Sequence, residues 1–183
     1  MESIAYQITA GPLSSSEIDV FYVLPLLESD TLREGASAGM RLEHDDGNVR
    51  WEGVAALFRD AGWVGREPEE LHAAFGRSTF KVFAYEGPEL VGIGRTIDDG
   101  RFYATVVDVV VARPWQRRGV GRAIVEDLQS RLAGFLVVTL TASPEAQPFY
   151  RRLGWRSQTT AMLLPRSPEQ ALANCRDAES EPE

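Results

Sequence analysis

Residues 111–121 connect two stretches of different hydrophobic periodicity, and they read Val111-Ala112-Arg113-Pro114-Trp115-Gln116-Arg117-Arg118-Gly119-Val120-Gly121. The preceding run, 102–111, is rich in Val, Tyr and Phe, as strands are, whereas apolar residues recur at helical spacing from Val120 to Leu128. Backbone N–H groups at a helix start lack intrahelical partners and carry partial positive charge, and glycines let an anion approach them. The stretch therefore predicts a strand, a turn and a helix start that together bind a phosphate-like anion.

Four arginines and no acidic residue lie between positions 113 and 122. Arg117, Arg118 and Arg122 are placed to add charge-assisted contacts to an anion at that turn. The alternative is that Gly119 and Gly121 only serve a tight turn, with solvated arginines around it. The chain as a whole is acidic, because 19 basic and 27 acidic residues give a net charge of −8. This balance argues against a nucleic-acid partner, which needs a broad basic surface.

The chain has 183 residues, of which 44% are apolar and 25% charged, as expected of one soluble globular domain. No apolar run approaches the roughly 18 residues of a membrane span, and the N-terminus lacks signal-peptide features, so we expect a cytoplasmic protein without a membrane partner. The single cysteine, Cys175, excludes an internal disulfide and a cysteine-based zinc site. His44 and His72 lack metal-ligand spacing, so we expect surface histidines and no metal.

Periodicity and turn residues predict an α/β layer structure, with a hairpin sheet followed by alternating strands and helices. We expect strands at 40–43, 80–85, 90–97, 102–111 and 136–140, and one more at about 159–164. We expect the strand at 136–140 to be buried. We expect helices at about 54–61, 68–75, 120–128 and 146–153. Four aromatic residues lie in or beside the first two helices, and we expect most of them in the core: Trp51, Phe58, Trp63 and Phe75.

Two segments flank the predicted domain at 40–165. The extension 1–39 has a strand-like run at 4–9 and a capping box at Ser14–Glu17, which predicts a short helix. Its apolar residues predict that it packs on the acceptor side or against a second subunit, so a homodimer is a candidate assembly. Residues 35–39 match a serine-hydrolase elbow, but without a strand before and a helix after them we expect a loop. Residues 166–183 form an acidic polar tail, whose end we expect to be solvated.

Two separate stretches resemble motifs of one enzyme family. Residues 111–121 resemble motif A of the GNAT family of acyl-CoA N-acyltransferases, Gln/Arg-x-x-Gly-x-Gly/Ala after a strand. A later helix of that family, Ala-x-x-Phe-Tyr-x-x-x-Gly-Phe, is similar to Ala146-Gln147-Pro148-Phe149-Tyr150-Arg151-Arg152-Leu153-Gly154-Trp155. The resemblance covers about residues 40–164. It implies a mixed, mostly antiparallel sheet flanked by helices, with splayed central strands.

The resemblance also implies an acetyl-CoA site. The backbone at 116–121 would hold the coenzyme A pyrophosphate, and residues 109–111 would align with the pantetheine amides as an added strand would. Tyr150 would protonate the leaving thiolate, because a phenol with a pKa near 10 keeps its proton at neutral pH. The expected cofactor-binding residues are Val109, Val110, Val111, Gln116, Arg117, Arg118, Gly119, Val120, Gly121, Arg122, Ser143, Phe149, Tyr150 and Arg152.

The chain departs from the family pattern at two functional positions. Ser143 stands where the family commonly has Asn, and we expect it to cap the following helix. The central strand lacks the glutamate that some members use as a general base, and Asp108 is its only carboxylate. Because a charge in an apolar strand needs a partner, Asp108 is either a site group or a hydrogen-bonded structural one. Tyr103, Thr105 and Asp108 are our candidates for acceptor contacts.

These observations lead us to expect an acetyl-CoA-dependent N-acetyltransferase that modifies the amine of a small molecule. A non-catalytic acyl-CoA-binding or regulatory domain would keep the anion-binding turn but lack the acid and the base. A toxin-like enzyme acting on aminoacyl-tRNA is a third alternative, but it would need the basic face that this acidic chain lacks. A dinucleotide-binding oxidoreductase is disfavoured, since both Gly-x-Gly pairs lack the third glycine of the fingerprint.

Overall fold

The computed structural model describes residues 39–175, which divide into two compact units, 39–160 and 161–175. The strand expected at 4–9, the helix expected after Ser14 and nearly all of the loop at 35–39 lie outside these residues. Within residues 39–175, no helix combines the length and the apolar character that crossing a membrane requires.

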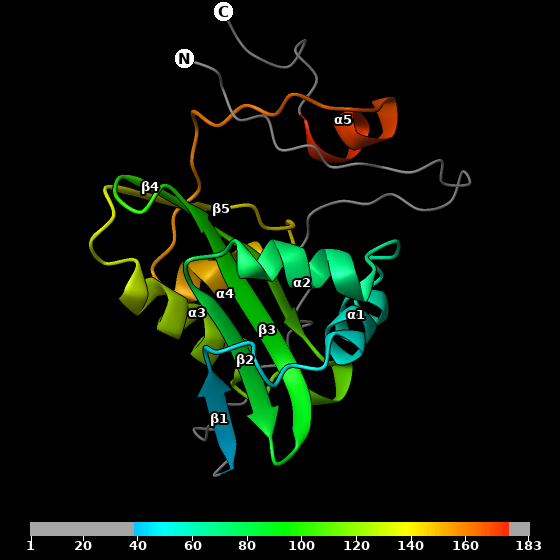
Figure 1. Ribbon diagram of the computed structural model, residues 1–183. Coiled ribbons are helices and arrows are strands. Elements are labelled where there is room, and N and C mark those ends of the chain that lie inside the picture. The colour runs from blue at the N-terminus through cyan, green and yellow to red at the C-terminus, as the bar shows by residue number, and fades with distance from the viewer. Residues whose placement is uncertain (1–38, 176–183) are drawn as a thin grey trace, which may run out of the picture. The chain divides into compact units, whose positions relative to one another are not determined.

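One five-stranded sheet forms the centre of the larger unit, in the order β1-β2-β3-β4-β5 (Figure 1). Neighbours from β1 to β4 run antiparallel, and β4 and β5 run parallel, which confirms the predicted mixed, mostly antiparallel sheet. The strands are β1 (Met40–Glu43), β2 (Lys81–Glu86), β3 (Glu89–Asp98), β4 (Tyr103–Val111) and β5 (Val137–Leu140).

Helices cover both faces of this sheet (Figure 1). On one face pack α1 (Trp51–Asp60) and α2 (Pro68–Gly76), and on the other α3 (Val120–Arg131) and α4 (Gln147–Arg152). Side chains alternate along a strand, so Val82 faces the α3 layer while Phe83 faces the α1 layer. The expected aromatic core is confirmed: Phe58, Trp63 and Phe75 are buried, and Trp51 packs against them.

Two glycines of β3 let α3 lie close to the sheet. A Cβ atom on Gly94 would sit 2.6 Å from Cγ2 of Ile124, and one on Gly92 would sit 2.9 Å from Cδ1 of the same residue. Both distances are shorter than carbon–carbon contacts allow. The glycines at 92 and 94 therefore serve helix–sheet packing, which explains a Gly-x-Gly pair without a nucleotide.

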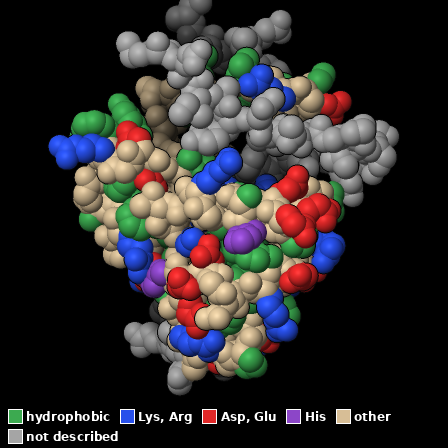
Figure 2. All heavy atoms as spheres, viewed as in Figure 1, with side chains coloured by type: hydrophobic (Ala, Val, Ile, Leu, Met, Phe, Trp, Pro, Cys, Tyr) green, Lys and Arg blue, Asp and Glu red, His purple; other side chains and the backbone are tan. Residues whose placement is uncertain are grey.

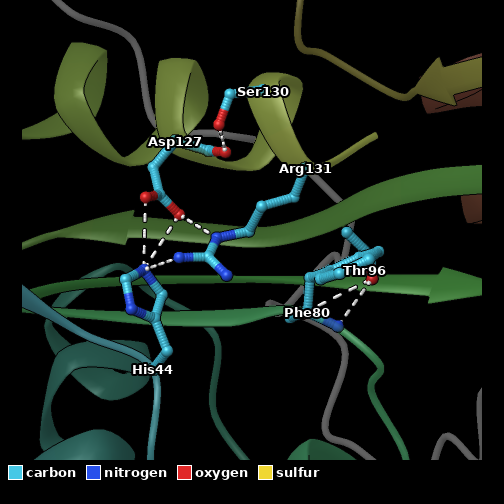
Figure 3. A network of polar contacts seen from close by, with 6 residues as sticks. All are labelled: His44, Phe80, Thr96, Asp127, Ser130 and Arg131. Carbon is cyan, nitrogen blue, oxygen red and sulfur yellow. Dashed lines mark hydrogen bonds and ion pairs between the residues drawn. The ribbon is translucent and has the colours of Figure 1, made fainter. Parts of the chain in front are cut away.

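A polar network joins the segment after β1 to α3 (Figure 3). The His44 Nε2 atom lies 3.1 Å from an Asp127 carboxylate oxygen, and Arg131 contacts both groups at 2.8 Å. Asp127 and Arg131 are one turn apart on α3, so they present one charged face to His44. His44 is thus a partly buried structural group, whereas His72 is exposed, as expected of a surface histidine.

Two strand predictions were wrong. β5 is not buried: Leu136 before it is 75% exposed and Val137 is 38% exposed, because β5 is the edge strand of the sheet. Residues 159–164 form no strand, and Met162 is 99% exposed. An apolar, β-branched run favours a strand, but the strand forms only where a partner supplies the hydrogen bonds.

The smaller unit includes a helix inside the segment predicted as a polar tail. This helix is α5 (Pro168–Asn174), and Ser167 caps it by accepting a hydrogen bond from the Gln170 backbone N–H at 3.1 Å. Serine at the N-cap and proline at the first helical position are ordinary helix-start residues. The free cysteine, Cys175, follows α5 and is exposed.

Candidate functional site

The parallel strands β4 and β5 part halfway along β4. Their pairing runs from Tyr103 opposite Val137 to Val106 opposite Leu140, and β4 then continues to Val111. The hydroxyls of Thr105 and Thr139 lie 2.9 Å apart across the strands just before they separate. Among the described strands, none pairs with residues 107–111 on this side, so those of their backbone N–H and C=O groups that point away from β3 face an open edge.

The turn after β4 presents backbone N–H groups at the start of α3. Gly119 is the N-cap, with φ of 85°, and the first helical bond runs from the Ala123 N–H to the Gly119 carbonyl at 2.9 Å. The N–H groups of residues 120–122 consequently lack intrahelical acceptors. Open space surrounds Gly119, because a Cβ atom added there would meet no heavy atom within 4 Å. Helix dipole and free N–H groups together favour an anion here.

Gln116 and Arg117 shape this turn. The Gln116 side-chain amide donates to the Val111 carbonyl at 3.1 Å, which ties the turn to the end of β4. Arg117 has a positive φ of 60°, unusual for a residue with a Cβ. Positive φ values at 117 and 119 let consecutive backbone N–H groups converge, a geometry common in anion-binding loops.

The four arginines between positions 113 and 122 make different contacts. Arg113 donates to the Asp60 carbonyl at 3.1 Å and so closes the C-terminus of α1. Arg118 stacks over the Trp115 ring at 5.0 Å, and Arg122 pairs with Glu126 at 2.8 Å on the surface of α3. Arg117, Arg118 and Arg122 are exposed around the turn, where they add positive potential.

The two sequence motifs meet beside Gly121. A Cβ atom there would sit 3.7 Å from Cζ of Phe149 on α4 and 3.5 Å from Cγ2 of Val111 on β4. Ser143 is buried, and its hydroxyl accepts from the Ala146 N–H at 3.2 Å, which confirms that it caps the turn into α4. Arg152, at the end of α4, is exposed, and its contact with a ligand stays a prediction.

Tyr150 lies in the apolar layer between α3, α4 and the sheet. It is 2% exposed, and its ring packs edge-to-face on Phe149 at 5.0 Å and on Trp155 at 6.2 Å. Burial raises the pKa of its phenol well above the ordinary value, with no opposing hydrogen bond or charge from the described residues. The hydroxyl is therefore a proton donor across the whole neutral range.

Asp108 is enclosed by two guanidinium groups. Its carboxylate accepts from Arg66 Nη1 at 3.0 Å and from Arg95 Nε at 2.6 Å, and the side chain is 1% exposed. Of the two roles that the sequence left open, this geometry is that of a hydrogen-bonded structural group. Sequence reasoning missed both arginines, although a buried carboxylate in an apolar strand signals that some cation must pair with it.

The three residues expected to contact an acceptor are not brought together. Tyr103 is 60% exposed at the start of β4, Thr105 is engaged with Thr139, and Asp108 is buried near the other end. Five residues of strand separate Tyr103 from Asp108 by about 16 Å, given the rise of an extended chain.

A hollow of about 220 Å³ lies beside α1 and the segment after it. It is lined by Glu52, Ala55, Arg59, Trp63, Val64, Gly65, Arg66, Glu67 and Pro68. Within residues 39–175, no group of three or more His, Cys, Asp or Glu side chains is arranged to hold a metal ion.

Comparisons with known proteins agree with this geometry. Residues 55–162 match the family described as the acetyltransferase (GNAT) domain. Histone acetyltransferase TAP1 of Glycine max is 32% identical over 124 residues, covering 61% of this chain and 54% of that protein. Serotonin N-acetyltransferase 2, chloroplastic, of Oryza sativa subsp. japonica is 30% identical over 135 residues, covering 70% and 68%.

Among solved structures, a putative acetyltransferase from Deinococcus radiodurans R1 has the same fold, with a TM-score of 0.64 and 24% identity. The match covers 76% of this chain and 97% of that one.

The chain spans only 45% to 68% of the length of the curated relatives that it matches.

Proposed function

The chain belongs to the GNAT acetyltransferase family, and from this premise we propose that it transfers the acetyl group of acetyl-CoA to the amine of a small molecule. One observation carries the proposal: an open β4 edge, an anion-binding turn and a buried phenol occur side by side, joined at Gly121, Val111 and Phe149. A protein that only bound an anion would need the turn, but not a proton donor beside an open strand edge.

The residues present fit acetyl-CoA. The free N–H groups at the start of α3, the open space at Gly119 and the exposed Arg117 and Arg118 would hold the pyrophosphate. Those backbone groups of residues 109–111 that point away from β3 would hydrogen-bond the pantetheine amides in the manner of strand addition. When bound, acetyl-CoA supplies the acetyl group as a thioester that an amine can attack directly.

Tyr150 supplies the proton that the departing thiolate needs. Its raised pKa keeps the proton on the phenolic oxygen at neutral pH, and the surrounding rings of Phe149 and Trp155 keep bulk water from competing for it. The amine itself must arrive unprotonated or lose its proton to water, because the Asp108 carboxylate is held by two arginines. Transfer should therefore accelerate as pH approaches the pKa of the amine.

Charge supports a small acceptor over a nucleic acid. The chain carries a net charge of −8, and acidic and basic side chains are interspersed on the face seen in Figure 2. The basic window at 113–122 would already be used by the phosphates of coenzyme A. A polyanion such as tRNA gains affinity only by neutralising many phosphates, whereas a small cationic amine is attracted by net negative charge.

The test is a mass-spectrometric screen with acetyl-CoA and three kinds of acceptor: free amines, a lysine-rich histone-tail peptide and bulk aminoacyl-tRNA at low salt. We expect acetylated free amines, formed at least about 100-fold more slowly by the Tyr150→Phe variant at the same enzyme concentration. Transfer confined to the peptide or to aminoacyl-tRNA would replace the small-amine acceptor by that class. Coenzyme A binding without transfer to any acceptor would make the protein a non-catalytic acyl-CoA-binding domain.

A further inference from the structure

Asp108 has a backbone conformation that few residues adopt. Its φ is 53°, in the left-handed region, where a Cβ crowds the backbone and only Gly, Asn and Asp are common. Such conformations persist where surrounding contacts hold them, and they concentrate at functional sites. Contacts around Asp108 must therefore hold its backbone in place.

The unusual conformation belongs to a β-bulge. Ile93 pairs with Val110 and Arg95 with Val107, so two steps along β3 face three steps along β4. The extra residue turns Asp108 toward the α1 and α2 layer, while Val109 stays in the apolar layer under α3. The bulge begins two residues after the last pair between β4 and β5, at the start of the open edge.

Two arginines hold the bulge through the Asp108 carboxylate, one on each oxygen. Arg66 comes from the segment between α1 and α2, and its guanidinium lies over the rings of Phe58 at 4.6 Å and Trp63 at 5.1 Å. Arg95 comes from β3, lies over Phe75 at 5.5 Å and donates to the Ser78 hydroxyl at 3.2 Å. Stacked and hydrogen-bonded guanidiniums have little freedom, so the carboxylate is clamped from both sides.

Stability alone is a weak reason for this arrangement. A buried ion cluster loses its hydration, and an apolar cluster of the same volume commonly stabilises a fold as well or better. A bulge is also unnecessary for sheet pairing, which it interrupts. What the cluster does provide is a defined direction for the backbone at the point where β4 leaves β5.

We propose that Arg66, Asp108 and Arg95 are positioning residues, which hold the β4 bulge so that the backbone groups of residues 109–111 that point away from β3 face the acetyl donor. This inference rests on the proposed function, and it assigns no chemical step to Asp108. Arg66 also lines the hollow beside α1, so the clamp connects that surface to the donor edge.

Substitutions at position 108 separate the effect of the backbone conformation from the effect of the clamp, by which we mean the contacts of Arg66 and Arg95 with the Asp108 carboxylate. Asp108→Gly keeps access to positive φ but removes the carboxylate, and Asp108→Asn keeps both the positive φ and one acceptor oxygen. We expect kcat to fall by about 10-fold or more in Asp108→Gly and by less in Asp108→Asn, with the KM for the amine nearly unchanged. Misplaced donor contacts slow transfer without removing the acceptor site.

A readout independent of activity is the amide hydrogen exchange of peptides that span 104–112, measured on the free protein. We expect faster exchange there in Asp108→Gly, and a weaker affinity for coenzyme A by calorimetry. Arg66→Gln repeats the test from the partly exposed end of the clamp, for the case that Asp108→Gly does not fold. Arg59→Gln is the matched control, since it removes a guanidinium from the same hollow without touching Asp108.

The outcomes are distinguishable. If the wild-type protein transfers acetyl groups and folded Asp108→Gly or Arg66→Gln retains the wild-type kcat and exchange rates, the positioning role is refuted while the proposed function stands. Loss of kcat equal in Arg59→Gln and Arg66→Gln would also refute it. If the wild-type protein transfers nothing, the proposed function fails, and unchanged exchange at 104–112 would then refute the clamp separately.

Discussion

The Cζ atom of Phe149 lies 3.7 Å from the position that a Cβ atom on Gly121 would take. Gly121 is in the first turn of α3, and Phe149 is on α4, next to the buried Tyr150. This contact packs the first turn of α3 against α4, the helix that carries the candidate proton donor.

Replacing Gly119 by Val should weaken coenzyme A binding at least about 10-fold, because a branched side chain blocks the approach of a phosphate to the backbone. The matched control is Gly62→Val, since both glycines have φ of 85° and open space around them. Both variants bear similar backbone strain, but only Gly119 is in the turn. Calorimetry with coenzyme A measures the difference, and equal affinities in the two variants would contradict the assigned turn.

Replacing Tyr150 by Phe should lower kcat by about 10²- to 10⁴-fold, the range of general acid catalysis, with little change in coenzyme A affinity. The free energy of unfolding should stay nearly the same, because no hydrogen bond or charge from the described residues acts on the hydroxyl. Tyr85→Phe, on β2 and away from the open edge, is the control. A wild-type turnover in Tyr150→Phe would leave Tyr150 as a packing residue only.

The pH dependence of turnover is a second test of Tyr150 as the proton donor. Burial raises its pKa above the ordinary value near 10, so the acid keeps its proton throughout the neutral and mildly alkaline range. The rate should rise with pH as the amine loses its proton, without an alkaline decline below about pH 10 caused by the phenol. An alkaline limb near pH 8 that disappears in Tyr150→Phe would show the opposite shift.

Gly94→Ala should destabilise the fold by about 1–3 kcal/mol, because its methyl group would lie 2.6 Å from Ile124 and force α3 away from β3. Gly76→Ala at the end of α2 is the control, since its Cβ would meet no atom within 4 Å. Urea denaturation of both variants checks the expectation. A Gly94→Ala variant as stable as Gly76→Ala would mean that α3 shifts without cost.

Asp46 ties the segment after β1 to β2. Its hydrogen bond from Lys81, at 2.6 Å, lowers the pKa of the carboxyl below the ordinary value. A lowered folded-state pKa contributes stability above the unfolded value near 4, and this contribution is lost as pH falls through the folded-state pKa. Asp46→Asn should therefore lower the unfolding free energy by about 1 kcal/mol at pH 7. In thermal melts the difference between the two proteins should begin to shrink below about pH 4 and disappear once the pH is below the folded-state pKa, and a constant difference down to pH 2 would refute the pairing.

Local patterns sufficed for most elements and for the two motifs. Strand and helix periods, Gly62 after α1 and Pro68 at the start of α2 are properties of neighbouring residues, so β1 to β4 and α1 to α4 were predictable. The capping role of Ser143 was predictable for the same reason, since a cap acts within one turn. The family resemblance added the expectation that β4 and β5 would part.

Long-range contacts decided the rest. Asp108 meets Arg66 from 42 residues away and Arg95 from 13 residues away, and no local pattern selects those partners among 18 arginines. Leu136 and Val137 look like a buried strand, but the order of strands puts β5 at the edge, where one side lacks a neighbour. Apolar character records what a side chain prefers, whereas burial and pairing depend on which distant segments arrive beside it.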